Sequence, residues 1–209
     1  MFAGLLHVCA SAVCHQLPSR SLFFNGIPFS WCARCMGVYS SIALSAIYFA
    51  VRKRLFANRP FSIWAALWIV LCFLPIALDG GGSYLGLWES NNLKRILSGA
   101  CCGWTLPGLF LLCGNFQPQS KNEIPLMDHP LEWILLPLLA CTLCLFVFFQ
   151  TSSQILYWTA SCLTLLGEVV FWSGLWYILL CNLLQRKHPF LAAFIGGIGT
   201  MLLIGGIMQ

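Results

Sequence analysis

The stretch FLAAFIGGIGTMLLIGGIM, residues 190–208, contains no charged side chain. An apolar helix of about 20 residues spans the hydrocarbon core of a bilayer, so this stretch predicts a transmembrane helix. Five further apolar segments of comparable length precede it, at residues 36–51, 62–78, 96–114, 131–149 and 155–180. Lipid offers the backbone no hydrogen bonds, and none of these segments alternates like a strand. We therefore expect an all-α polytopic bundle of about six transmembrane helices.

The composition agrees with an exterior that faces lipid. Hydrophobic residues make up 59% of the 209 residues and charged residues 8%, against about 25% in soluble domains. The net charge of +5 comes from short basic clusters between apolar runs. No basic stripe with interleaved aromatic side chains is present, so nucleic-acid binding is not expected. The lipid bilayer is the partner that the composition predicts.

The N-terminal region differs in character from the rest of the chain. Residues 1–13 are mildly apolar, too short to span a bilayer and without the charged start of a signal peptide. We expect residues 1–35 to form an interfacial segment that caps the transmembrane bundle of residues 36–209. The two parts are expected to make one domain.

The distribution of basic residues predicts the orientation. Three loops that share one side of a six-helix bundle hold seven of the 11 basic residues: Arg52, Lys53, Arg54, Arg59, Lys121, Arg186 and Lys187. The other side holds four, namely Arg20, Arg34, Lys94 and Arg95. Because cytoplasmic loops carry an excess of Lys and Arg, the N-terminal region is expected to lie on the extracytoplasmic side.

A Cys/His motif lies in the polar, turn-rich part of the N-terminal segment. Cys14 and His15 precede the C-x-x-C pair Cys32 and Cys35, and the Asn-Gly at 25–26 allows the chain to turn back between them. Thiolates and imidazoles are the usual ligands of zinc, so the four residues predict a Zn²⁺ site. Because Cys14 and His15 are adjacent, a site with three ligands and an open position is also considered.

Two other interpretations of these cysteines stay open. The first is a structural or redox-active disulfide, either Cys32–Cys35 or from Cys14 to one of them. Arg34, between the two cysteines of the pair, would lower their thiol pKa, which suits both metal binding and redox chemistry. The second is that the cysteines have no joint role. Eight cysteines in the apolar runs are interpreted as packing residues.

These motifs resemble a prokaryotic integral membrane family, domain of unknown function 2085. The matching residues are Cys14, His15, Gln16, Pro18, Arg20, Ser21, Cys32, Ala33, Arg34, Cys35, Gly37 and Tyr39, followed by Asp79-Gly80, Asn91 or Asn92, Arg95 and Ser98-Gly99. Met36 stands where family members often have Thr. The resemblance covers roughly residues 9–108 and implies a prokaryotic cytoplasmic (inner) membrane, without implying a particular activity.

The predicted topology brings the two motif regions to one side of the membrane. Asp79 and Arg95 close and open consecutive helices, so an ion pair between them is one expectation. The other is a polar pocket for a small anionic or lipid-headgroup ligand, because arginine binds phosphate and carboxylate groups bidentately. Its candidate binding residues are Arg20, Arg34, Asn91, Asn92 and Arg95.

Three residues are candidates for catalysis or transport. His15 and Asp79 could act as general bases, and Glu168 stands alone in an apolar segment, where a carboxylate costs about 2.5–3.5 kcal/mol. We therefore expect a metal-binding membrane protein with an Arg/Asp pocket. The alternatives are a metal-dependent enzyme acting on a lipid-like substrate, a thiol–disulfide oxidoreductase using Cys32 and Cys35, and a small-solute or ion transporter using Glu168.

Overall fold

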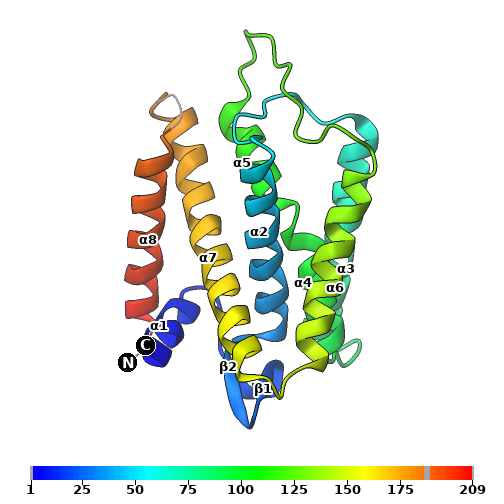
Figure 1. Cartoon of the computed structure of the whole chain (residues 1–209), viewed down its shortest axis with the longest axis vertical. Coiled ribbons are helices and arrows are strands. Elements are labelled where there is room, and N and C mark those ends of the chain that lie inside the picture. Colours follow the sequence, from blue (N-terminus) through cyan, green and yellow to red (C-terminus); the bar gives the residue numbers. More distant parts are fainter. Residues whose placement is uncertain (1, 186–188, 209) are drawn as a thin grey trace.

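Long apolar helices standing side by side form the body of the molecule, in a computed structural model that describes residues 2–185 and 189–208 (Figure 1). The elements in chain order are α1 (Phe2–Ser11), the 3-10 turn η1 (Pro18–Arg20), β1 (Ser21–Phe24), β2 (Ile27–Cys32), α2 (Ala33–Val51), α3 (Ile63–Tyr84), α4 (Asn92–Gly103), α5 (Leu106–Asn115), α6 (Glu132–Phe149), α7 (Gln154–Asn182) and α8 (Phe190–Ile207).

The predicted membrane helix bundle is confirmed. Within the described residues, six helical stretches are long and apolar enough to cross a bilayer. In the most apolar 18-residue window of the stretch Asn92–Asn115, 67% of the residues are buried inside the protein. In that of Ile63–Tyr84, only 17% are buried. The former therefore lies at the centre of the bundle and the latter presents most of its surface to lipid. Arg186 and Lys187, which contributed to the charge count, lie outside the described residues.

The third spanning stretch is broken in its middle, where the sequence predicted one helix with an internal proline. Helix α4 ends at Gly103 and α5 begins at Leu106, with Trp104 and Thr105 between them. Pro107 then stands in the first turn of α5, where its missing N–H leaves no helical hydrogen bond unmade. Because the helix restarts next to Pro107, the proline does not cost the helix a backbone hydrogen bond.

Helices α2 and α4 approach each other closely because glycines line their contact. A Cβ atom on Gly37 would lie 2.2 Å from the carbonyl oxygen of Ile96, and one on Gly99 would lie 2.4 Å from that of Arg34. Neither position leaves room for a side chain. The contact therefore sets the start of α2 directly against the first turns of α4.

The N-terminal segment forms a cap at one end of the bundle. Helix α1 and the β1–β2 hairpin lie at this end, and the C-terminal end of α8 packs against α1 (Figure 1). The hairpin turns at Asn25 and Gly26, whose φ angles of 49° and 80° are typical of a tight type I′ turn. The two strands were not predicted. Helix α3 also continues past the predicted end at residue 78 to Tyr84, which places Asp79 inside the helix.

Candidate metal centre

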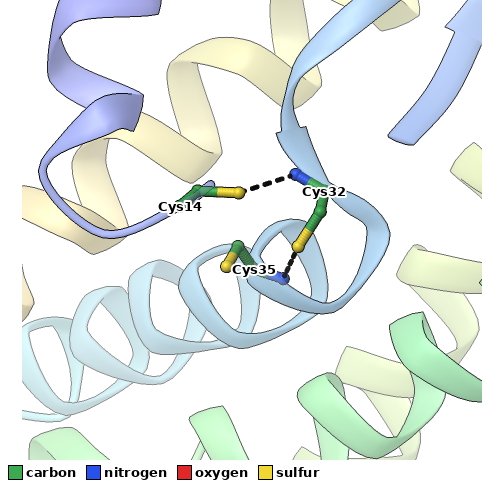
Figure 2. Close-up of side chains that lie close together, drawn as sticks. All are labelled: Cys14, Cys32 and Cys35. Carbon is green, nitrogen blue, oxygen red and sulfur yellow. Dashed lines mark hydrogen bonds between the residues drawn. The ribbon is translucent and has the colours of Figure 1, made fainter. Parts of the chain in front are cut away.

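Three separate elements each bring one cysteine to the capped end. Cys14 follows α1, Cys32 is the last residue of β2, and Cys35 lies in the first turn of α2 (Figure 2). Cys32 is also the N-cap of α2, and its Sγ atom accepts a hydrogen bond from the backbone N–H of Cys35. The C-x-x-C spacing therefore places two sulfurs at a helix N-terminus, where the helix dipole favours negative charge.

The three thiols converge. The Sγ atoms of Cys14, Cys32 and Cys35 all lie within 4.8 Å of one another. Cys14 is buried and the other two are half-buried. The backbone N–H groups of Cys32 and Gln16 donate to Cys14 Sγ over 3.2 and 3.4 Å, and the first of these is drawn in Figure 2. Amide donors of this kind stabilise a thiolate.

The cluster distributes protons unevenly among its sulfurs. Hydrogen bonds from the Cys14 and Cys35 thiols lower the pKa of Cys32 well below its ordinary value of 9.0. The bond that Cys14 gives to Cys32 raises the pKa of Cys14. The lowered pKa favours the thiolate form of Cys32, and a thiolate is the form that attacks disulfides and binds metals.

A cavity of about 170 Å³ opens beside the thiols. Besides Cys14, Cys32 and Cys35, its lining residues are Val13, His15, Gln16, Leu17, Arg20, Arg34 and Arg95. Three arginines from three different parts of the chain therefore border the same space as three cysteines. The polar pocket and the Cys cluster, predicted as neighbours, share one cavity.

His15 stands apart from the other three predicted ligands. It lines the cavity but is solvent-exposed, and it is not part of the group whose donor atoms lie within 4.8 Å. The structure thus brings three of the four predicted ligands together and leaves His15 outside the group.

Asp79 pairs with Arg34 of α2, and not with Arg95 as the sequence suggested. Its second oxygen accepts a hydrogen bond of 2.5 Å from Ser90 Oγ. Among the described residues neither Arg20 nor Arg95 has an acidic partner within ion-pair distance. Arg34 therefore has a carboxylate in direct contact, whereas Arg20 and Arg95 have none within ion-pair distance among the described residues.

Asn91 and Asn92 hold α4 and Arg95 in place and do not line the cavity. Asn91 is the N-cap of α4, and its Oδ1 atom accepts from the backbone N–H of Lys94 over 2.8 Å. Asn92 donates to the carbonyl of Ser21 and accepts from Arg95, each over 3.1 Å. The amide of Asn92 therefore ties the hairpin to the arginine beside it.

Glu168 lies in α7, away from the lining of the cavity, and is completely buried. Its Oε2 atom accepts a hydrogen bond of 2.9 Å from the indole Nε1 of Trp31. Trp31 immediately precedes Cys32, so the isolated carboxyl contacts the residue next to the cluster. Sequence reasoning missed this partner because 137 residues separate the two side chains.

The comparisons with known proteins agree with the fold and the motif region. Residues 14–109 match the family model described as "Predicted membrane protein (DUF2085)". An uncharacterised protein of Methanocaldococcus jannaschii is 34% identical over 101 residues, which cover 48% of this chain and 63% of that protein. An uncharacterised protein of Methanothermobacter thermautotrophicus is 31% identical over 91 residues, covering 44% of this chain and 78% of that protein.

The matched region contains the three clustered cysteines and the three cavity arginines but ends before α6. The chain spans less than two thirds of the length of the M. jannaschii relative. No solved structure matches the chain. The shared region and the membrane helices together show that the chain belongs to the DUF2085 family of integral membrane proteins.

Proposed function

We propose that this membrane protein binds a zinc ion through the thiolates of Cys14, Cys32 and Cys35. The observation that supports the proposal is the convergence of the three Sγ atoms within 4.8 Å. Sulfurs bound to one tetrahedral zinc at about 2.3 Å lie about 3.8 Å apart, so shifts of about 1 Å suffice to form the site. Three thiolates also select zinc over hard cations such as Mg²⁺ and Ca²⁺.

The fourth coordination position would face the arginine-lined cavity and receive an anionic ligand. Zn²⁺ with three thiolates carries a net charge of −1, and Arg34 is neutralised by Asp79. Arg20 and Arg95 then leave an excess positive charge in a space of about 170 Å³. A small anion or a lipid headgroup with a phosphate or carboxylate fits this charge, since guanidinium groups bind both bidentately. Asn91 and Asn92 support this site through α4 and Arg95.

Elemental analysis of the purified protein, prepared without chelator, tests the metal. We expect about one zinc per chain in the wild type and a loss of the bound zinc in Cys32→Ser and Cys35→Ser variants. Cys113→Ser and Cys162→Ser are matched controls, because these exposed cysteines lie outside the cluster. A wild-type protein without stoichiometric metal would contradict the proposal.

A second candidate function is thiol–disulfide exchange at Cys32 and Cys35. The observation that favours it is the position of the Cys32 sulfur at the N-terminus of α2, within 4.8 Å of two further free thiols. Alkylation of the protein before and after treatment with a reductant separates the two candidates. A redox role predicts that the number of reactive thiols at Cys32 and Cys35 rises on reduction, whereas a zinc site predicts that it rises on chelation.

A further inference from the structure

Glu168 is a carboxyl group buried in a spanning helix without a cation. Its exposed fraction is 0%, and among the described residues no basic side chain lies within ion-pair distance. Oε2 accepts the hydrogen bond from Trp31, and Oε1 has no hydrogen-bond partner in the described part of the chain. The bond to Trp31 is thus the specific polar contact that the side chain makes.

A leucine at this position would pack into the same space without the cost of burying a polar group. Burying a carboxyl group costs more free energy than burying an apolar side chain of similar volume, even when one hydrogen bond is made. A contribution to the stability of α7 therefore does not explain why a carboxyl group stands at this position. Its contact with Trp31 does.

Trp31 and Cys32 occupy opposite faces of the end of β2. Side chains alternate along a strand, and Trp31 is 0% exposed among the bundle helices while Cys32 points towards the cavity. The backbone N–H of Cys32 also donates to Cys14 Sγ over 3.2 Å. A shift of the strand end would consequently displace one sulfur and remove a hydrogen bond from another.

We infer that Glu168 is a positioning residue of the cysteine cluster, which holds Cys32 in place through the indole N–H of Trp31. The inference rests on the proposed function. The carboxyl fixes the strand end from inside the membrane, and the strand end fixes the two sulfurs on its far side. Residues that orient metal ligands in this way change metal affinity by about 10- to 100-fold when they are replaced.

Zinc affinity in competition with a chelator tests the inference in full-length protein. Glu168→Gln retains an acceptor oxygen and is expected to bind zinc with nearly the affinity of the wild type. Glu168→Leu removes the acceptor and Trp31→Phe removes the donor, so each is expected to weaken binding at least about tenfold. The double variant Glu168→Leu/Trp31→Phe is expected to bind zinc no more weakly than the weaker of the two single variants. Both substitutions remove the same hydrogen bond, so their effects do not add.

Trp172→Phe is the matched control. The Trp172 indole N–H is buried without a hydrogen-bond partner among the described residues, so its removal is expected to leave zinc affinity unchanged. Wild-type affinity in both Glu168→Leu and Trp31→Phe would overturn the inference. Binding in Glu168→Gln as weak as in Glu168→Leu would also overturn it, because the carboxyl charge and not the hydrogen bond would then matter.

A readout that needs no metal separates this inference from the proposed function. The rate of Cys32 alkylation in chelator-treated protein reports the position of its sulfur. We expect Glu168→Leu and Trp31→Phe to change this rate relative to the wild type and to Glu168→Gln. If the wild type binds no zinc but these rates differ as expected, the proposed function fails and the positioning role stands. Equal rates in all four proteins would contradict the positioning role, whatever the zinc content.

Discussion

Arg34 connects the two motif regions at the level of a single side chain. It lies between Cys32 and Cys35 in sequence, lines the cavity, and forms an ion pair with Asp79 in α3. Its Nε atom is buried without a partner among the described residues, so the guanidinium has an unused donor next to the ion pair. The arginine thus both joins α2 to α3 and keeps a polar group close to the thiols.

Replacing Asp79 by Asn is expected to destabilise the protein by about 2 kcal/mol, because a partly buried guanidinium loses its counter-charge. Denaturant unfolding of the protein in detergent measures the change. In the double variant Arg34→Gln/Asp79→Asn the two effects are expected to be less than additive, since both remove one interaction. Additive effects would show that the ion pair does not couple the two helices.

Metal binding is expected to release protons at pH 7. The hydrogen bond to Cys32 raises the pKa of Cys14, which favours its thiol form in the metal-free protein, and a thiol must lose its proton to bind zinc. Zinc affinity therefore falls as the pH falls, since protons compete for the sulfur. Titration calorimetry in buffers of different ionisation enthalpy counts the protons, and Cys14→Ala is expected to release fewer than the wild type.

Among the secondary-structure elements, the contact between α2 and α4 determines the geometry of the site. Gly99 lies against the backbone of Arg34, one turn of helix after Arg95. The close approach carries the cysteines at the start of α2 and the arginine at the start of α4 to the same cavity. Glycines at this contact are therefore part of the site's architecture, although they line no part of the cavity.

Gly99→Val is expected to destabilise the protein by about 1–3 kcal/mol, because its Cβ would lie 2.4 Å from a backbone oxygen and force the helices apart. It is also expected to weaken zinc binding by moving Cys35 relative to Cys14. Unfolding in detergent and chelator competition measure the two effects. Gly81→Ala is the control at the same end of the bundle, because an added Cβ there meets no atom within 4 Å.

At the scale of the whole molecule, the cap lies at the opposite end from the two described basic loops, residues 52–62 and 116–131. The hairpin and α1 are at one end of the bundle, and the loop of residues 116–131 extends from the other (Figure 1). Arg52 and Arg54 lie at that second end and pair with Asp128. Because basic loops remain cytoplasmic, we propose that the cap faces the extracytoplasmic side of the inner membrane.

Labelling with a membrane-impermeant thiol reagent tests this orientation. Ile27→Cys places a thiol on the hairpin, at an exposed position, and Ser120→Cys places one in the exposed loop at the other end. In spheroplasts the first is expected to react and the second only after the membrane is permeabilised. Mass spectrometry of the labelled peptides distinguishes both from the native cysteines, and the reverse pattern would refute the proposed orientation.

Much of the fold follows from composition and local pattern. Apart from the end of α3, which extends beyond the predicted residue 78 to Tyr84, the ends of the spanning stretches were predicted within a few residues, because segment length and apolarity are requirements of the bilayer. The break at Trp104–Thr105 was not, because a proline in an apolar run indicates a bend as readily as a new helix start. The hairpin was also missed, although its Asn-Gly turn was recognised, because its strands are too short to show clear alternation.

The amino-acid sequence alone shows that this chain lies in a membrane as a helix bundle, and it identifies the cysteines and arginines of the candidate site. Helix packing, in contrast, pairs Asp79 with Arg34, leaves His15 outside the thiol group and brings Glu168 into contact with Trp31. The first set depends on solvation, which each segment experiences independently of the others. The second depends on how helices rotate and pack against one another, which no local pattern encodes.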